Sequence, residues 1–272
     1  MKIGVNLRCS MLDSFSEIYK DYNIQHVQIT LPADVSLIEN DLVKNINRFK
    51  NYNNIEISFH AYPFNLAERV ETVRRTWVGL AEKTISLAGR VGAGFVNFHA
   101  GYGFDAAKRI EHEELVSRLI PVLNELTDKG AINNIEVHIE NLYPEQRNSD
   151  FCKIGDRLSD FERIFANIDS PILKLCYDYG HGNLDEHGID ILRKFHSRLG
   201  SIHAHDNDQL ADIHWPIGNK VKGTIDWVKE IQYLMDINYK GVFILEGYTH
   251  DQLESLEYLQ KSKLTLFKDN IS

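Results

Sequence analysis

Short apolar segments alternate along the chain with longer segments whose hydrophobic residues recur at helical spacing. The predicted strands are residues 2–8, 24–31, 55–61, 94–101, 135–142, 172–180, 199–205 and 241–247. Val70–Gly89 is typical of the helices between them, with a predicted stripe of Val70, Val73, Trp77, Leu80, Ala81, Thr84 and Leu87. Eight strand–helix units in 272 residues favour an α/β protein, a closed (β/α)8 TIM barrel that forms a single domain over residues 1–272.

Motifs, net charge and cysteine spacing further limit the possible folds, partners and cellular compartment. An open doubly wound sheet is the alternative fold, but no GxGxxG motif follows the first predicted strand. The formal net charge of −9 argues against a general polyanion-binding surface. The cysteines Cys9, Cys152 and Cys176 show no paired spacing, which favours a reducing compartment. With no signal-peptide pattern and no membrane-spanning run, we predict a cytoplasmic protein without a membrane partner.

Titratable side chains gather at the carboxyl ends of the third to eighth predicted strands. These ends meet at one mouth of a barrel, where enzymes of this fold carry their active sites. The candidates are His60, His99, Glu140, Asp178, His181, His203, His205, Asp212, His214 and Glu246. Carboxylates crowded into a half-buried mouth repel one another and lose hydration, and a divalent cation removes both problems. Mixed imidazole and carboxylate ligands favour zinc, with manganese or iron as alternatives.

The spacing within these segments supports a common centre. Asp178 and His181 flank a glycine-containing turn that lets both side chains face one point. Asp212 and His214 fall on one side of an extended loop. The remaining histidines lie on predicted helices, in loops or deeper in the barrel, and we expect structural roles for His26, His112, His138, His187, His196 and His250.

The motifs SFHAYPFNLA, VNFHAG, IEN, DYGHGN, IHAHD, DIHWPIG and ILEG resemble those of the xylose isomerase-like TIM-barrel superfamily, which includes endonuclease IV. The resemblance implies a metal centre in the barrel mouth, with the shared core ligands Glu140, Asp178, His203 and Glu246. Alternation along the strand cannot choose between His203 and His205, because both share a side. The superfamily pattern of a histidine three residues before an acid favours His203.

Further matches resemble the trinuclear zinc centre of the endonuclease IV branch, which implies one to three ions per chain. By that resemblance the first metal binds His60, His99 and Glu140, and the third binds His181, Asp212 and His214. The chain departs from endonuclease IV at the segment NLYPEQR after Glu140, in the loop CSMLDSFSE, and at Lys220, which replaces a glycine. We therefore do not expect DNA as a partner, and predict a small sugar or sugar-phosphate substrate.

Two reaction types remain open. Phosphoester hydrolysis is slightly favoured because it uses all nine candidate ligands: clustered metals activate water and hold the attacking and leaving oxygens. The alternative is sugar or sugar-phosphate isomerisation or epimerisation at a single metal held by the four core ligands. A metal-stabilised, non-enzymatic sugar-binding barrel is a third possibility. The expected catalytic residues are Glu140, Glu246 and His181, and the expected substrate contacts are Arg8, Tyr62, His205 and Trp215. Asp206 and Asp208 are expected to orient imidazoles.

Overall fold

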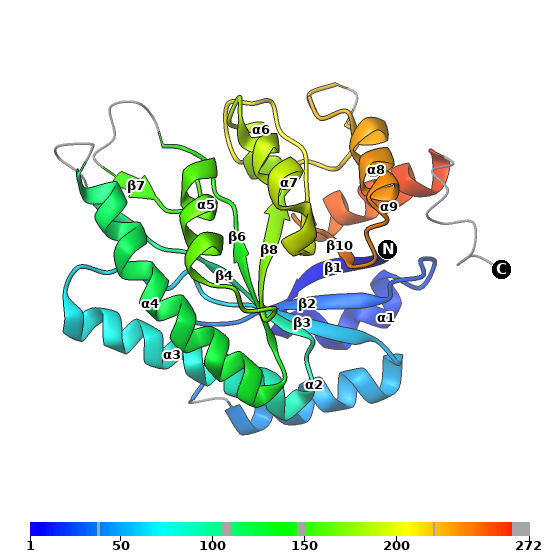
Figure 1. The fold of residues 1–272 in the computed structure, drawn as a ribbon. Helices are drawn as coiled ribbons and strands as arrows, with labels where there is room; N and C mark the ends of the chain where they lie inside the picture. Colours follow the sequence, from blue (N-terminus) through cyan, green and yellow to red (C-terminus); the bar gives the residue numbers. More distant parts are fainter. Residues whose placement is uncertain (37–38, 105–109, 146–150, 220, 263–272) are drawn as a thin grey trace.

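Eight parallel strands close into a barrel in the order β1–β10–β9–β8–β6–β4–β3–β2 (Figure 1). The computed structural model describes residues 1–36, 39–104, 110–145, 151–219 and 221–262. The barrel strands are β1 (Lys2–Arg8), β2 (His26–Thr30), β3 (Glu56–His60), β4 (Phe95–His99), β6 (Glu136–Glu140), β8 (Leu173–Asp178), β9 (Leu199–Ala204) and β10 (Val242–Leu245). Each lies within one predicted strand segment, so the predicted barrel is confirmed.

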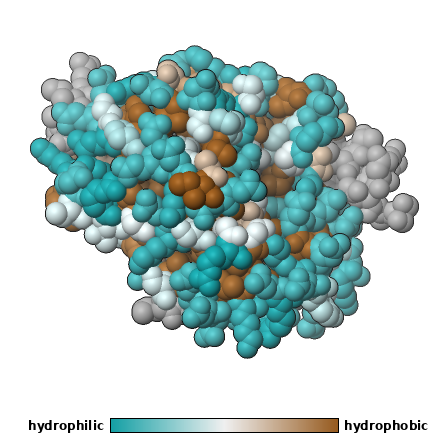
Figure 2. All heavy atoms as spheres, turned by 60° about the horizontal axis from the view of Figure 1, so that its bottom comes forward, coloured by the Kyte–Doolittle hydropathy of each residue, from teal (hydrophilic) through white to brown (hydrophobic). Residues whose placement is uncertain are grey.

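Helices surround the barrel on its outside (Figure 1). They are α1 (Phe15–Ile18), α2 (Glu39–Asn53), α3 (Glu71–Val91), α4 (Ile110–Asn133), α5 (Leu158–Asn167), α6 (Tyr179–Asn183), α7 (Gly188–Phe195), α8 (Trp227–Asp236) and α9 (Thr249–Lys261), with 3-10 turns η1 (Cys9–Ser14) and η2 (His196–Arg198). On the face in Figure 2, hydrophilic residues cover most of the surface. Among the described residues, no helix is both long enough and apolar enough to span a membrane.

The buried face of α3 differs from the predicted stripe. The helix buries Val78, Ala81, Thr84, Ile85, Leu87, Ala88 and Val91. Val70 and Val73, which the pattern placed on the buried side, are 54% and 42% exposed. The hydrophobic residues of this segment are numerous enough to fit two adjacent stripes, and only packing against the barrel selects one of them.

A small antiparallel sheet lies outside the barrel and was not predicted. It pairs β5 (Tyr102–Phe104), which follows β4, with β7 (Phe151–Lys153), which comes after β6. The rings of Tyr102 and Phe104 both contact Phe151, with centroids 5.1 and 5.5 Å apart. The sheet therefore joins the segments that follow the strands ending in His99 and Glu140.

The barrel interior contains pairs of polar side chains from different strands. His26 Nε2 lies 2.7 Å from Ser58 Oγ, and His138 Nδ1 lies 2.8 Å from Ser201 Oγ. Both histidines are at most 3% exposed. Because a buried polar atom without a partner destabilises a fold, these pairs explain how the barrel accommodates its inner histidines. They agree with the structural roles expected for these two residues.

Candidate metal centre

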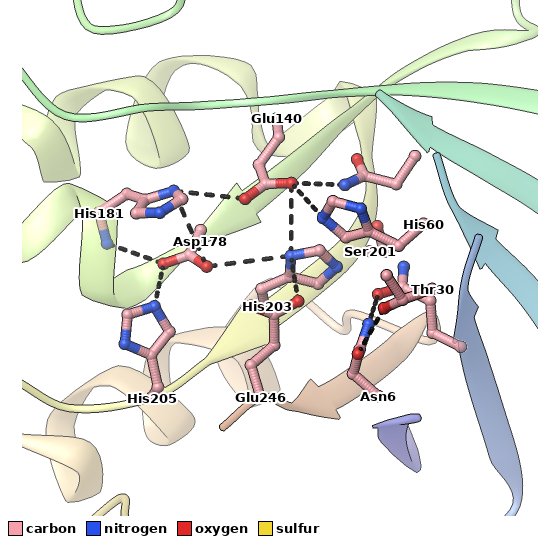
Figure 3. A network of polar contacts seen from close by, with 12 residues as sticks. Asn6, Thr30, His60, Glu140, Asp178, His181, Ser201, His203, His205 and Glu246 are labelled. Carbon is pink, nitrogen blue, oxygen red and sulfur yellow. Dashed lines mark hydrogen bonds and ion pairs between the residues drawn. The ribbon is translucent and has the colours of Figure 1, made fainter. Parts of the chain in front are cut away.

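The barrel mouth brings the predicted ligands together from the ends of six strands and the loop after β9. Figure 3 shows six of them: His60, Glu140, Asp178, His181, His203 and Glu246. Strand register aligns His99 with Glu140 and Asp178 with His203. These alignments follow from parallel pairing, which places the carboxyl ends of all the strands at one side. Three side chains of the core, Glu140, Asp178 and His203, are at most 1% exposed, and the fourth, Glu246, is 9% exposed.

Glu140 is the carboxylate with the largest number of imidazole neighbours in the centre. Its Oε2 lies 3.5 Å from His60 Nε2, 3.5 Å from His99 Nε2 and 3.5 Å from His203 Nδ1. The Nδ1 of His60 lies 2.9 Å from the carbonyl of Ala61, so it carries the proton and donates it there. The Nε2 of His60 then faces Glu140 and is the nitrogen that could ligate a metal after losing any proton it holds.

His203 lies within ligand-like distance of each of the three core carboxylates. His203 Nδ1 lies 3.5 Å from Glu140 Oε2, 3.9 Å from Asp178 Oδ2 and 3.1 Å from Glu246 Oε1. Ligand atoms on a tetrahedral metal with bonds of about 2.1 Å stand about 3.4 Å apart. Asp178 Oδ2 and both ring nitrogens of His203 are buried without a hydrogen-bond partner. Such orphaned atoms are costly unless a ligand satisfies them, so the residues fit a divalent cation.

A second group of ligand atoms lies beside the core. The side chains of His181, His205, Asp212 and His214 each offer an atom within 4.8 Å of the others. Asp212 lies 3.3 Å from His181 Nε2, 3.3 Å from His214 Nε2 and 3.7 Å from His205 Nε2. His181 Nδ1 donates to the carbonyl of Asn141 at 2.9 Å, which leaves Nε2 facing Asp212. The structure thus brings His181, Asp212 and His214 together and adds His205 to them.

The turn after β8 explains why Asp178 and His181 lie so close. Asp178 caps α6, and its Oδ1 accepts a hydrogen bond from the backbone N–H of His181 at 2.7 Å. His205 Nε2 lies 3.1 Å from the same carboxylate, and its ring stacks on His214 at 3.7 Å. His205 is 0% exposed and lies between the core and the second group, and its contact with a substrate stays a prediction.

The other expected substrate contacts lie at a strand end or next to a candidate ligand in the sequence. Arg8 is exposed at the carboxyl end of β1, and Tyr62 is 41% exposed beyond His60. Trp215 follows His214, and Lys222 Nζ lies 5.2 Å over its ring. Contact between these side chains and a substrate stays a prediction. Lys220 and the last two residues of NLYPEQR fall outside the described residues.

Two buried asparagines support the carboxylates, and the sequence analysis missed them. Asn97 Nδ2 donates to Glu140 Oε2, while Asn141 donates to the Asp178 carbonyl at 3.0 Å and accepts from the Asp178 N–H at 2.7 Å. Asn97 shares its side of β4 with His99, and Asn141 directly follows Glu140. Strand alternation could therefore have identified Asn97, because residues two apart face the same side.

The centre of the metal-free protein holds protons on imidazoles beside ionised carboxylates. Burial opposes ionisation of Asp178, but the charges of His181 and His205 lower its pKa to about 2. Burial likewise opposes the charge on His214, but Asp212 and Glu246 raise its pKa to about 9. A metal must displace such protons, so metal binding is expected to release protons and to strengthen as the pH rises.

We expect the chelated, metal-free protein to lose stability as the pH rises. The stabilisation from protonated His214 is full below its unfolded pKa of 6.5 and is lost as the pH rises through the folded value of about 9. The melting temperature in chelator should therefore fall over this window, and less steeply in His214→Asn. A melting temperature that stays constant over the window in the wild type would contradict the charged pairs.

Asp206 does not orient an imidazole, contrary to expectation. Its Oδ2 accepts from Trp227 Nε1 at 2.8 Å, and its Oδ1 accepts from the N–H groups of Asn207 and Thr224 at 2.9 and 3.0 Å. Asp208 Oδ1 accepts hydrogen bonds from the backbone N–H groups of Leu210 and Ala211 in an exposed turn. The Asp206 carboxylate therefore attaches the loop that contains Asp212 and His214 to Trp227, the first residue of α8.

Replacing Asp206 with alanine is expected to lower the free energy of unfolding by about 3 kcal/mol or more, because buried donors lose a charged acceptor. Urea denaturation measures the change. The neighbouring Asp208→Ala variant is the control, with an expected loss of about 1 kcal/mol or less. Equal losses in the two variants would show that Asp206 does not hold this loop.

Comparison with known proteins identifies the family. The chain matches the xylose isomerase-like TIM barrel family over residues 10–266 and belongs to it. It is 27% identical over 171 residues to the uncharacterized protein y4fM of Sinorhizobium fredii, covering 61% of this chain and 51% of that protein. It is 32% identical over 82 residues to D-psicose 3-epimerase of Enterocloster bolteae, covering 30% and 25% of the two chains. The matches thus span about half or less of these relatives.

Solved structures agree on the fold. A D-tagatose 3-epimerase-like protein superimposes with a TM-score of 0.83 at 24% identity, with 100% of both chains covered. The 3-keto-D-glucoside 4-epimerase YcjR from E. coli gives 0.76 at 18% identity, covering 96% of this chain and 99% of that one. The activities named for these relatives are sugar epimerisations. The preference for a phosphoester hydrolase is therefore not supported, and the comparisons favour the alternative of sugar isomerisation or epimerisation.

Proposed function

We propose that the protein is a metal-dependent sugar epimerase that acts beside the carbonyl of a ketose or ketose phosphate. The observation that carries the proposal is the placement of Glu140 and Glu246 around His203. The two carboxylates come from β6 and β10, which are separated in the barrel by β8 and β9. They approach His203 Nδ1 from different sides, at 3.5 and 3.1 Å (Figure 3).

Two opposed carboxylates suit inversion at carbon. Epimerisation removes a proton from one face of the carbon next to a carbonyl and returns a proton to the other face, whereas aldose–ketose isomerisation needs only one such group. Glu140 and Glu246 would exchange these protons, and His181 would contact the substrate. An ion held by Glu140, Asp178, His203 and Glu246 would polarise the substrate oxygens. Zinc, manganese and iron all suit this donor set.

One observation still favours hydrolysis as a second candidate. The ligand atoms of His181, His205, Asp212 and His214 are compact enough for a further ion, and multinuclear centres suit phosphoester cleavage. In the epimerase these four side chains, together with His60 and His99, would contact sugar hydroxyls or bind accessory ions. The substrate assay therefore includes a phosphodiester.

Solvent exchange tests the proposal directly. The metal-loaded protein is incubated in D₂O with D-psicose, D-tagatose and their phosphates, and proton NMR follows the hydrogen beside the carbonyl. Loss of that signal together with appearance of the epimer is expected, and the chelated protein should show neither. Failure to exchange any ketose, with slow cleavage of bis-p-nitrophenyl phosphate, would instead support the hydrolase.

A further inference from the structure

A separate group of buried titratable side chains lies outside the barrel mouth. His112 belongs to α4, Asp160 lies in the first turn of α5, and Asp156 precedes that helix. Their exposed fractions are 4%, 1% and 7%. Each offers a ligand atom within 4.8 Å of the other two. The proposed epimerase reaction uses none of them, so their burial needs another explanation.

One oxygen of this group points inward without a donor. His112 Nε2 lies 2.8 Å from Asp160 Oδ1, and Asp160 Oδ2 accepts from the Gly155 N–H at 2.9 Å. Asp156 Oδ1, in contrast, is buried without a hydrogen-bond partner and lies 4.0 Å from His112 Nε2. Arg157 Nε lies 3.6 Å from that oxygen, on a side chain that is 50% exposed. The hydrogen-bond donors and positive charges around the two carboxylates therefore do not fully satisfy Asp156.

The charge balance of the group favours a cation. Burial and then the neighbouring Asp160 raise the pKa of Asp156 to about 6, although His112 and Arg157 oppose the shift. The two carboxylates share one buried space, which is unfavourable for their charged forms unless positive charge accompanies them. A divalent cation would supply this charge and satisfy the orphaned oxygen.

We propose that His112, Asp156 and Asp160 form a structural divalent-cation site, separate from the centre in the barrel mouth. One imidazole nitrogen and two carboxylate oxygens suit zinc or manganese, with water completing the coordination. The ion would join α4 to the start of α5 and, through Asp160, to Gly155.

Gly155 links this site to the backbone that follows Glu140. Its carbonyl accepts from the Leu142 N–H at 2.8 Å, two residues beyond Glu140. Its φ of +95° lies in the region that favours glycine, and a Cβ at this position would lie only 3.0 Å from the carbonyl oxygen of Glu140. A cation bound at Asp160 would therefore stabilise the backbone on which Glu140 is held.

Asp156→Asn tests the site with little structural disturbance, because Asp156 Oδ1 makes no hydrogen bond that the variant would lose. In chelator the variant should melt at or above the wild-type temperature, since a buried negative charge is removed. With Zn²⁺ or Mn²⁺ added to the full-length protein, the wild type should bind one more ion per chain and gain a larger rise in melting temperature. Elemental analysis after dialysis and thermal melts measure both effects.

The exposed pair His187 and Asp190 provides a matched control, with side chains 74% and 53% exposed and 3.5 Å apart. Asp190→Asn should bind metal as the wild type does. His112→Gln is a second variant and should also lose one ion. Equal metal content and equal metal-induced melting shifts in wild type, Asp156→Asn and His112→Gln would overturn the site and identify the group as a proton-sharing cluster.

Discussion

Glu140→Gln is expected to slow epimerisation at least about a thousandfold, the range seen when a general acid–base group is lost. Glu140 Oε2 lies 3.5 Å from each of His60, His99 and His203, so the carboxylate both gathers the imidazoles and faces the core. The neutral amide can neither accept the substrate proton nor balance a cation. Steady-state rates on the active ketose and metal content after dialysis measure the two losses.

Glu136→Gln is the matched control for this variant. Glu136 lies on the same side of β6 at the opposite end of the strand, 44% exposed and 3.1 Å from His138 Nε2. Its replacement should leave metal content and rate within a few-fold of the wild type, about 1 kcal/mol or less in activation free energy. Full metal content in Glu140→Gln would show that Glu140 is not a metal ligand. An unchanged rate would show that it is not a catalytic residue.

His203→Ala is expected to weaken metal binding at the core more than about a hundredfold, which exceeds the usual loss on removing a residue that only supports a ligand. His203 Nδ1 faces three carboxylates of the core, whereas His205 Nε2 faces Asp178 and Asp212. His205→Ala should therefore retain the core ion and the greater part of the activity. Competition with a coloured chelator measures the affinity of each variant.

His250→Ala is the control for these two replacements, because His250 is 73% exposed and lies on α9. It should bind metal as the wild type does. Retained core affinity in His203→Ala, with loss in His205→Ala, would reverse the assignment of the ligand from β9.

Sequence patterns alone predicted the barrel and the residues at its mouth. Alternating apolar segments located all eight strands, and the carboxyl ends of six of them carried the histidines and acids that the structure brings together. Both properties are periodic and local: strand residues alternate between two faces, and parallel strands place their carboxyl ends on one side. Neither needs knowledge of which side chains touch.

Strand periodicity alone could not show which of those side chains lie together, and this is what the tertiary structure adds. His203 and His205 are two residues apart and face the same side of the strand, so alternation could not distinguish them. Strand pairing aligns His203 with Asp178. The ring of His181 faces Asp212 because the backbone carbonyl of Asn141, at the end of another strand, accepts a hydrogen bond from its Nδ1. Ring orientation depends on such distant partners, and so does the grouping of His112 with acids more than forty residues away along the chain. Periodicity describes one segment at a time, whereas a site is made where several segments meet.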